Sequence, residues 1–146
     1  MATLSRSSVP VWLSSGRGLR SDRFYPLETR YTEQGYNYPD VMVISLPVEL
    51  QEGRKETVTN PLMIAEVLSK STKNYDKDEK FAAYRSISSF QEYLLIDQYQ
   101  TKVEHYYKAK VNQWVFSEYQ SRADLVKLTS LPCEISLADL YDDLQW

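Results

Sequence analysis

Apolar residues along the chain gather in three short runs, at residues 41–44, 62–68 and 93–96. Within each run neighbouring positions are apolar, with Glu66 as a lone carboxylate in the middle of the second. A strand with one wet face would instead alternate apolar and polar residues. Continuous runs of this length are typical of strands covered on both faces of a sheet. We therefore expect each of the three runs, the first inside an extended segment over residues 40–46, to form a buried strand.

Alternating positions follow the third run. Residues 102–108 and 113–119 alternate closely enough to predict a β-hairpin, with Val103, His105 and Tyr107 on one face of its first strand. Neither a serine nor a cysteine is placed to form a catalytic triad with His105. We therefore interpret His105 as an ordinary surface or core histidine.

Helical spacing appears in two places. Residues 76–86 carry large apolar side chains three apart on one face. Residues 136–144 begin at Ser136, an N-cap residue with Asp139 three positions later, which is a weak capping box. The apolar face of this second helix is expected to comprise Leu137, Leu140, Tyr141 and Leu144. Strands and helices in this order predict a mixed α/β domain, a central sheet flanked by helices.

The length of 146 residues suits a single domain with one core. We expect residues 1–20, rich in Ser and Arg, to form an irregular lead-in and residues 21–146 to form the domain. Shorter extended segments are expected at residues 9–13, 23–31 and 125–129, with a turn around Gln34 and Gly35 and loops over residues 49–58 and 69–74.

Composition removes several classes of function. The chain has one cysteine, Cys133, and one histidine, which excludes an internal disulfide and the usual His/Cys zinc sites. This cysteine usage fits a reducing compartment, and no apolar run approaches the roughly 20 residues that span a bilayer. We expect a cytoplasmic protein with no membrane partner. A formal net charge of −3 argues against non-specific coating of nucleic acid, although one site can still be basic.

Two acidic residues occupy positions in or next to apolar strands, where a charged carboxylate is energetically unfavourable. Asp40 opens the first apolar run directly after Pro39, and Glu66 lies inside the second run. A carboxylate within a buried strand costs several kcal/mol unless it is paired, neutralised or bound to a metal. If the two strands pair as a hairpin, both carboxylates converge on one ion, and hard oxygen ligands suit Mg²⁺ or Mn²⁺.

Lys80 is the third candidate, because it lies on the next helix and could stabilise charge on a scissile phosphate. Each residue also has a purely structural interpretation. Asp40 after a proline is often a turn residue, and Glu66 could form an ion pair with Arg85 or Lys80. Lys80 could itself form a solvated pair with Asp76, four residues earlier on the helix.

Four segments together resemble the Uma-two family, which belongs to the PD-(D/E)XK, or restriction-endonuclease-like, nuclease superfamily. They are Tyr-Pro-Asp-Val-Met-Val at residues 38–43, the segment at 61–72, the segment at 75–84, and the Glu-Tyr-Leu-Leu-Ile-Asp strand within residues 90–97. The resemblance covers roughly residues 24–143. It implies a restriction-endonuclease-like core with a metal site at one edge of the sheet.

The resemblance also implies roles for individual residues. Asp40 corresponds to the acid of the Pro-Asp motif and Glu66 to the second acid. The superfamily's usual lysine lies two residues after that acid, where this chain has Leu68, and the family moves it to the following helix, at Lys80. The carbonyl of Val67 is expected as a further ligand of Mg²⁺ or Mn²⁺. The residues expected to contact the ligands rather than the metal are Asp76 and Tyr84.

Family members usually have a longer region before the Pro-Asp strand, which brings helices and a further acid, whereas 39 residues precede Asp40 here. We therefore expect one sheet face to be less covered, which favours a homodimer.

Three functions remain open at this point. The first is a Mg²⁺-dependent endonuclease acting on nucleic acid, with DNA preferred, that leaves a 5′-phosphate and a 3′-hydroxyl. The alternative is a catalytically inactive nuclease-like fold that serves as a nucleic-acid-binding or oligomerisation module. In the third, the acids and Lys80 form a structural ion-pair network in a protein that acts on an unrelated small molecule.

Overall fold

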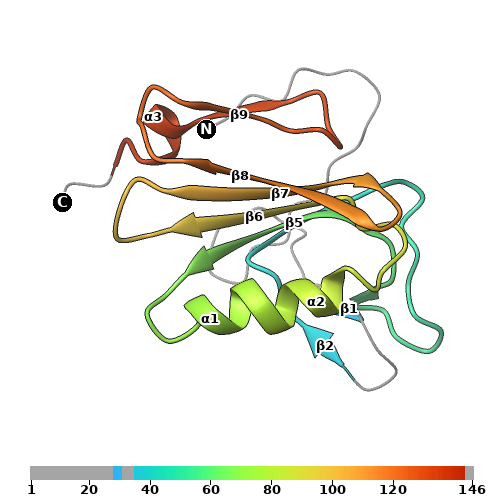
Figure 1. The fold of residues 1–146 in the computed structure, drawn as a ribbon. Helices are drawn as coiled ribbons and strands as arrows, with labels where there is room; N and C mark the ends of the chain where they lie inside the picture. Colours follow the sequence, from blue (N-terminus) through green and yellow to red (C-terminus); the bar gives the residue numbers. More distant parts are fainter. Residues whose placement is uncertain (1–27, 31–34, 144–146) are drawn as a thin grey trace.

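The computed structural model describes residues 28–30 and 35–143. Its centre is a mixed sheet of five strands in the order β3-β5-β6-β7-β8 (Figure 1). These strands are β3 (Val41–Ile44), β5 (Pro61–Leu68), β6 (Glu92–Asp97), β7 (Val103–Lys110) and β8 (Gln113–Tyr119). The three continuous apolar runs and the hairpin are thus strands, as predicted, all in one sheet, and the domain is α/β.

The pairing of the strands follows their connections. The segment between β3 and β5 reverses the chain, so these two strands pair antiparallel. β6, β7 and β8 form an antiparallel meander. β5 and β6 pair in parallel, because the chain between them crosses back as a helix. This helix runs without interruption through α1 (Lys73–Tyr75), η1 (Asp76–Lys80) and α2 (Phe81–Tyr84), and it covers one face of the sheet (Figure 1).

The helix begins three residues before the predicted start at residue 76 and ends two residues before the predicted end at 86. Asp76, where the predicted helix began, is of a residue type that favours N-caps. Here Asp76 is buried inside the helix, and its N–H donates to the carbonyl of Thr72 at 2.8 Å. The segment Asp76–Lys80 is π-helical, which the sequence pattern did not indicate.

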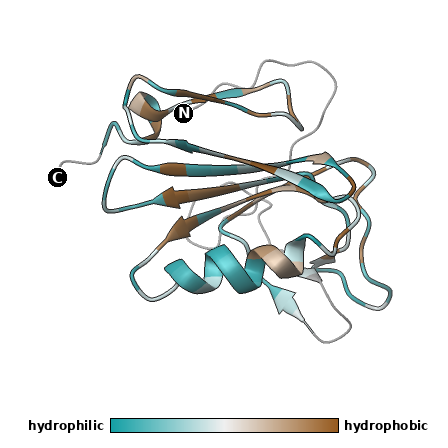
Figure 2. Ribbon diagram, viewed as in Figure 1, coloured by the Kyte–Doolittle hydropathy of each residue, from teal (hydrophilic) through white to brown (hydrophobic). Residues whose placement is uncertain are grey.

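Two apolar layers bury the sheet from both sides, which is why its central strands have continuous apolar runs. Between the helix and the sheet lie Met42, Ile44, Val58, Ile64, Leu68, Phe81, Tyr84, Ile87, Phe90, Tyr93 and Leu95. The helix changes along its length from hydrophilic to more hydrophobic (Figure 2), and the residues that it contributes to this layer, Phe81 and Tyr84, come from its second half. On the other face the layer consists of Val43, Met63, Ala65, Leu94, Val103, Val126, Leu131, Leu137 and Tyr141.

This second face is covered by β9 (Leu125–Lys127), β10 (Glu134–Ser136) and α3 (Leu137–Leu140) (Figure 1). The strand β9 confirms the extended segment predicted at 125–129, but β10 was not predicted. Ser136 both ends β10 and caps α3, and it accepts a hydrogen bond from the N–H of Asp139 at 3.3 Å, as the capping box predicted.

The predicted helix over 136–144 is wrong in length, because α3 is a single turn. Its packing accounts for the difference. Leu137 and Tyr141 are buried, but Leu140 is 36% exposed and belongs to no apolar layer, so no continuous face supports a longer helix. Leu144 lies outside the described residues.

A small second sheet is built from segments before β3 and between β3 and β5. It is formed by β1 (Glu28–Arg30), β2 (Tyr36–Asn37) and β4 (Thr57–Val58), in the order β2-β1-β4. The predicted extended segment at 23–31 therefore appears as β1. The predicted loop over 49–58 is wrong at its end, because Thr57 and Val58 are buried and pair with β1. The predictions for residues 1–20, including the segment at 9–13, and for Gln34 lie outside the described residues.

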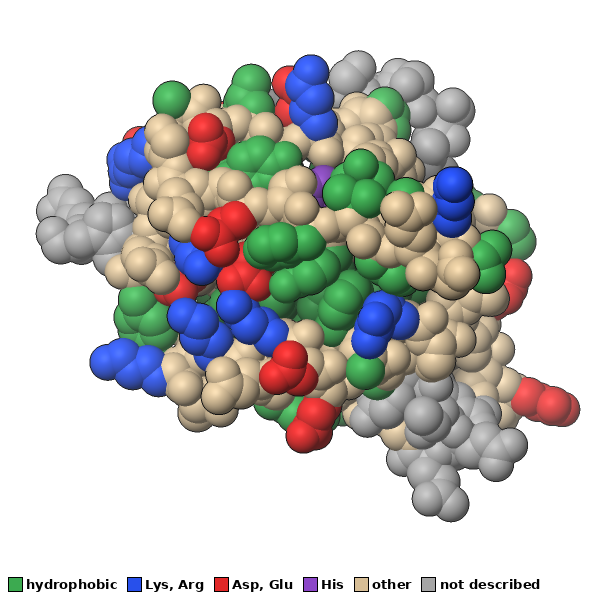
Figure 3. Space-filling model, in the orientation of Figure 1, with side chains coloured by type: hydrophobic (Ala, Val, Ile, Leu, Met, Phe, Trp, Pro, Cys, Tyr) green, Lys and Arg blue, Asp and Glu red, His purple; other side chains and the backbone are tan. Residues whose placement is uncertain are grey.

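One ion pair connects the helix to the β7–β8 hairpin, and a second links the residue before β7 to β8. Lys77 Nζ lies 2.5 Å from Glu104 Oε1, and Lys102 Nζ lies 2.8 Å from Glu118 Oε2. Basic and acidic side chains lie next to one another on this face, beside hydrophobic side chains that fill its middle (Figure 3). Among the helices of residues 28–30 and 35–143, none combines the length and apolar character needed to cross a bilayer.

Candidate active site

Strand register brings the two candidate acids to the same point of the sheet. β3 and β5 pair with Val41 opposite Ala65, so the next step of the ladder places Asp40 opposite Glu66. Side chains alternate along β5, and Ile64 and Leu68 face the helix, so Glu66 faces it as well. The expected hairpin between the two strands is confirmed.

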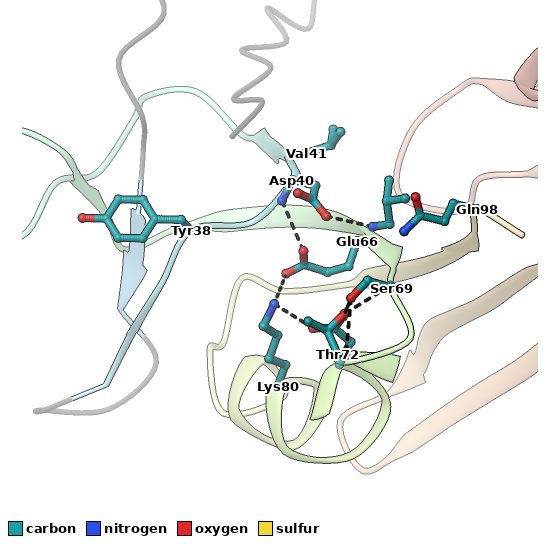
Figure 4. Close-up of a pocket in the computed structure, with 10 residues that line it drawn as sticks. Tyr38, Asp40, Val41, Glu66, Ser69, Thr72, Lys80 and Gln98 are labelled. Carbon is teal, nitrogen blue, oxygen red and sulfur yellow. Dashed lines mark hydrogen bonds and ion pairs between the residues drawn. The ribbon is translucent and has the colours of Figure 1, made fainter. Parts of the chain in front are cut away.

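Hydrogen bonds from backbone N–H groups link the Asp40 and Glu66 carboxylates to each other's strands (Figure 4). The N–H of Asp40 donates to Glu66 Oε2 at 3.2 Å, and the N–H of Val67 donates to Asp40 Oδ2 at 2.8 Å. Each carboxylate is therefore fixed by the main chain of the partner strand. As a result the two carboxyl groups lie side by side, on an edge of the sheet where Asp40 is only half-buried.

The helix brings Lys80 onto Glu66 from the other side. Lys80 Nζ lies 3.3 Å from Glu66 Oε1 and 2.7 Å from Asp76 Oδ1. Lys80 is the cation that pairs with Glu66; the guanidinium of Arg85 instead lies over the ring of Phe81. The interpretation of Lys80 and Asp76 as a solvated pair is wrong, since their side chains are only 14% and 3% exposed.

Tyr84 completes the surroundings of Glu66. Its hydroxyl donates to Glu66 Oε1 at 3.0 Å, from one turn further along the helix than Lys80. The hydroxyl of Tyr93 on β6 donates to the carbonyl of Asp76 at 2.9 Å and so fixes the start of η1. The structure thus brings Asp40, Glu66, Lys80, Asp76 and Tyr84 into one cluster.

Asp40, Glu66, Asp76 and Lys80 of this cluster line a pocket of about 490 Å³. Sequence reasoning missed five of its lining residues: Tyr38, Val41, Ser69, Thr72 and Gln98. Ser69 and Thr72 follow Glu66 along the chain, where their hydroxyls lie 2.9 Å apart. Gln98 follows β6 and donates to the carbonyl of Leu68 at 3.0 Å. The position of Ser69, Thr72 and Gln98 along the chain could have indicated them. They follow β5 and β6, two parallel strands, and the carboxyl ends of parallel strands meet at one edge of a sheet.

Burial dominates the chemistry of Glu66. It is 2% exposed, and burial raises the pKa of its carboxyl from an ordinary value of 4.5 to about 7, against the opposing effect of Lys80. The negative charge of Asp40 also raises this pKa, whereas the Tyr84 hydroxyl and the Asp40 N–H lower it. Glu66 is thus a group that exchanges its proton near neutral pH.

Lys80 and Tyr84 keep their protons. Burial alone would lower the pKa of Lys80, but Asp76 and Glu66 outweigh burial and raise it. Burial and the neighbouring Glu66 raise the pKa of Tyr84. At neutral pH the ammonium of Lys80 and the phenol of Tyr84 therefore both donate to Glu66.

The charges and oxygen ligands of the pocket decide whether it suits a divalent cation. With all acids ionised, three carboxylates (Asp40, Glu66 and Asp76) against one ammonium (Lys80) leave two negative charges, which a divalent cation would balance. In residues 28–30 and 35–143 no group of three or more His, Cys, Asp or Glu side chains is placed to hold a metal. Two carboxylates supplemented by waters are what Mg²⁺ commonly takes in proteins, so the residues present fit Mg²⁺.

A second buried polar cluster lies away from this pocket, around Glu92 on β6. Glu92 Oε1 lies 2.6 Å from His105 Nε2 and accepts from the N–H of Thr129, while Oε2 accepts from the N–H and the hydroxyl of Ser130. His105 is therefore a core histidine. The glutamate sits between His105 and Ser130, so this is not a catalytic triad, in which the histidine would contact the serine.

Comparisons with known proteins give a matching family model and similar sequences. The model of the Uma2 family, described as "Putative restriction endonuclease", matches residues 7–139. The uncharacterized protein sll1609 of Synechocystis sp. is 49% identical over 85 residues, which are 58% of this chain and 48% of that protein. The uncharacterized protein slr1290 of the same organism is 33% identical over 113 residues, 76% of this chain and 57% of that protein. The chain spans about half the length of the curated relatives it matches.

A solved structure shares the fold. It is described as "a putative nuclease belonging to DUF820" from Anabaena variabilis, with a TM-score of 0.63, 17% identity, and coverage of 82% of this chain and 66% of that one. At this identity the likeness concerns the fold alone, which is the restriction-endonuclease-like fold.

Proposed function

Because this chain belongs to the Uma2 family of restriction-endonuclease-like proteins, we propose that it hydrolyses phosphodiester bonds of nucleic acid at the Asp40–Glu66 site with Mg²⁺ or Mn²⁺. The observation that carries the proposal is the pair of hydrogen bonds that fixes the Asp40 and Glu66 carboxylates side by side. Two ionised acids at this spacing repel each other, and a bound cation would offset that repulsion.

In this proposal Asp40, Glu66 and the carbonyl of Val67 would hold the cation. The bound ion would lower the pKa of a water and polarise the scissile phosphate. The ammonium of Lys80 stabilises the negative charge that develops on the phosphate as the oxygen of the attacking water bonds to phosphorus. The bond from phosphorus to the 3′-oxygen then breaks and leaves a 5′-phosphate and a 3′-hydroxyl.

Two further residues act through these groups. Asp76 holds the Lys80 ammonium from behind, at 2.7 Å, so that it stays beside Glu66. Tyr84 donates to Glu66 Oε1 and thereby stabilises the charged carboxylate that metal binding needs. Both are positioning residues in this scheme.

The test is cleavage of a supercoiled plasmid in the presence of Mg²⁺ or Mn²⁺. The wild type is expected to nick or linearise the plasmid, and Asp40→Asn and Lys80→Ala are each expected to lose about 100-fold or more of the rate. Glu134→Gln is the matched control, because this exposed carboxylate pairs with Lys127 outside the pocket. Equal cleavage by the wild type and both pocket variants would reject the site. No cleavage by the wild type would instead favour an inactive nuclease-like module.

A further inference from the structure

A second pocket, of about 310 Å³, adjoins the candidate active site. It is lined by Tyr38, Arg54, Lys55, Glu56 and Thr57. Tyr38 lines both pockets, so the two pockets meet at this residue. Tyr38 also lies two residues before Asp40, within about 7 Å along an extended chain, a distance that a nucleic-acid strand covers in a step or two.

The two pockets have opposite charge. The active-site pocket has three carboxylates against one ammonium, whereas in the second pocket Arg54 and Lys55 outweigh the single carboxylate of Glu56. A pocket of net negative charge attracts a cation but repels the phosphates on either side of the scissile one. Nucleic acid therefore needs positive charge next to the metal site, and the second pocket supplies it.

The loop that carries these cations is held in shape. Gln51 N–H donates to the carbonyl of Thr57 at 2.9 Å, and Thr59 N–H donates to the carbonyl of Glu49 at 2.9 Å, so the loop closes as a small hairpin. Its tip turns at Gly53, whose φ of 77° lies in the region that favours glycine. The guanidinium of Arg54 stacks over the ring of Tyr36, 4.4 Å from its centroid. A guanidinium already held against a ring loses less conformational entropy when it binds an anion.

We propose that the Arg54–Lys55 pocket binds the phosphodiester backbone of the substrate strand immediately beside the cleavage site, with the strand passing over Tyr38. This inference rests on the proposed nuclease function, since it names where the strand lies relative to that site. The 58% exposed ring of Tyr38 offers a nucleotide a surface to stack on between the two pockets.

The experiment measures binding without cleavage. A fluorescein-labelled DNA strand and its duplex are titrated with protein in Ca²⁺, a hard cation that takes the same oxygen ligands, and anisotropy is followed at several salt concentrations. The double variant Arg54→Ala/Lys55→Ala is expected to bind one or both probes about 10-fold or more weakly. Because each lost phosphate contact reduces the salt dependence by about one, the slope of log K against log salt is expected to fall by about 1.5–2.

The matched control is Lys110→Ala/Lys127→Ala, which removes the same amount of charge at two exposed positions that line neither pocket. It is expected to bind as the wild type does. Equal affinity and slope in the wild type and the Arg54–Lys55 variant would overturn the inference, as would equal weakening by both double variants or no binding by the wild type.

The inference and the proposed function fail separately. Plasmid cleavage that depends on Asp40, together with binding that ignores Arg54 and Lys55, rejects the second pocket and keeps the nuclease. Binding that depends on Arg54 and Lys55 in a protein that cuts no plasmid keeps the second pocket and rejects the nuclease.

Discussion

At the scale of single residues, Glu66 determines the chemistry of the site. It is buried, it accepts hydrogen bonds from Lys80 and Tyr84, and its pKa is raised to about 7. A raised pKa means that between about pH 4.5 and pH 7 the folded protein keeps a proton that the unfolded chain has lost. The stability contributed by Glu66 therefore falls as pH rises through this window, and the metal-free protein is less stable above it.

Glu66→Gln removes this penalty. Above pH 7, without metal, we expect the variant to be more stable than the wild type by on the order of 1–3 kcal/mol, because a neutral amide of the same shape replaces a buried charge. The same variant should lose the stabilisation that Mg²⁺ gives. Urea denaturation with and without Mg²⁺ measures both effects, and a metal-free variant that is less stable than the wild type would contradict the expectation.

The affinity for Mg²⁺ should depend on pH through the same group. The cation displaces the proton of Glu66, so affinity is expected to fall by about tenfold per pH unit below the pKa of about 7 and to level off above it. The charges of Asp40 and Lys80 lie next to the Glu66 carboxyl and also influence its pKa. Calorimetric titrations across this pH range provide the measurement, and an affinity independent of pH would argue against Glu66 as a ligand.

Tyr84→Phe tests the hydrogen bond to Glu66 alone. Without the phenol donor the charged carboxylate is less stable, so the pKa of Glu66 should rise further and the pH midpoint of Mg²⁺ binding should move upwards. Tyr36→Phe, at a tyrosine outside the pocket, serves as the control and should leave the midpoint unchanged. A midpoint that stays in place in Tyr84→Phe would show that the bond has no effect on ligand charge.

At the scale of elements, the helix between β5 and β6 delivers the cation to the acids. Its π-helical segment Asp76–Lys80 carries both members of the buried ion pair, and such segments are frequent at functional sites. The hydroxyl of Tyr93 fixes the start of this segment from the sheet. The site therefore depends on the position of one helix over the face where Glu66 points.

The covering layer of β9 and β10 depends on Glu92. Burial alone would raise the pKa of Glu92, but hydrogen bonds from His105, Ser130 and Thr129 outweigh it and lower the pKa. Because the folded pKa is depressed, this stabilisation is present above about pH 4.5 and is lost as pH falls through the lowered pKa.

Glu92→Ala should therefore destabilise the protein by about 3 kcal/mol or more at neutral pH, since it leaves buried donors without an acceptor. Denaturant unfolding measures this change. Glu134→Ala, an exposed partner of Lys127, is the control and should cost less than about 1 kcal/mol. Equal stabilities of the two variants would show that the Glu92 cluster does not hold the layer in place.

At the scale of the whole molecule, Mg²⁺ should act as a ligand of the native state. A ligand at 100 times its dissociation constant adds about 2.7 kcal/mol of stability, so the thermal midpoint should rise with Mg²⁺ concentration. Asp40→Asn should abolish this rise. A midpoint that ignores Mg²⁺ in the wild type would indicate a structural ion-pair network. The expected homodimer stays a prediction that sedimentation velocity can check.

Much of the central sheet could be predicted because its strands are buried on both faces. Burial of that kind produces the uninterrupted apolar runs at β3, β5 and β6, and the alternation in the hairpin is equally local. The short elements escaped prediction for the opposite reason. β2, β4 and β10 have two or three residues each, too few for a period, and they exist because a partner strand lies beside them.

The same division applies to the site. The sequence by itself determined that Asp40 and Glu66 need an explanation, because a carboxylate beside or within a buried strand is costly wherever it lies. Only the tertiary structure decided that Lys80 is buried rather than solvated, that Tyr84 and Asp76 stabilise opposite sides of the ion pair, and that Gln98 and Tyr38 line the pocket. These contacts join segments up to tens of residues apart through strand register and helix placement, which no local pattern encodes.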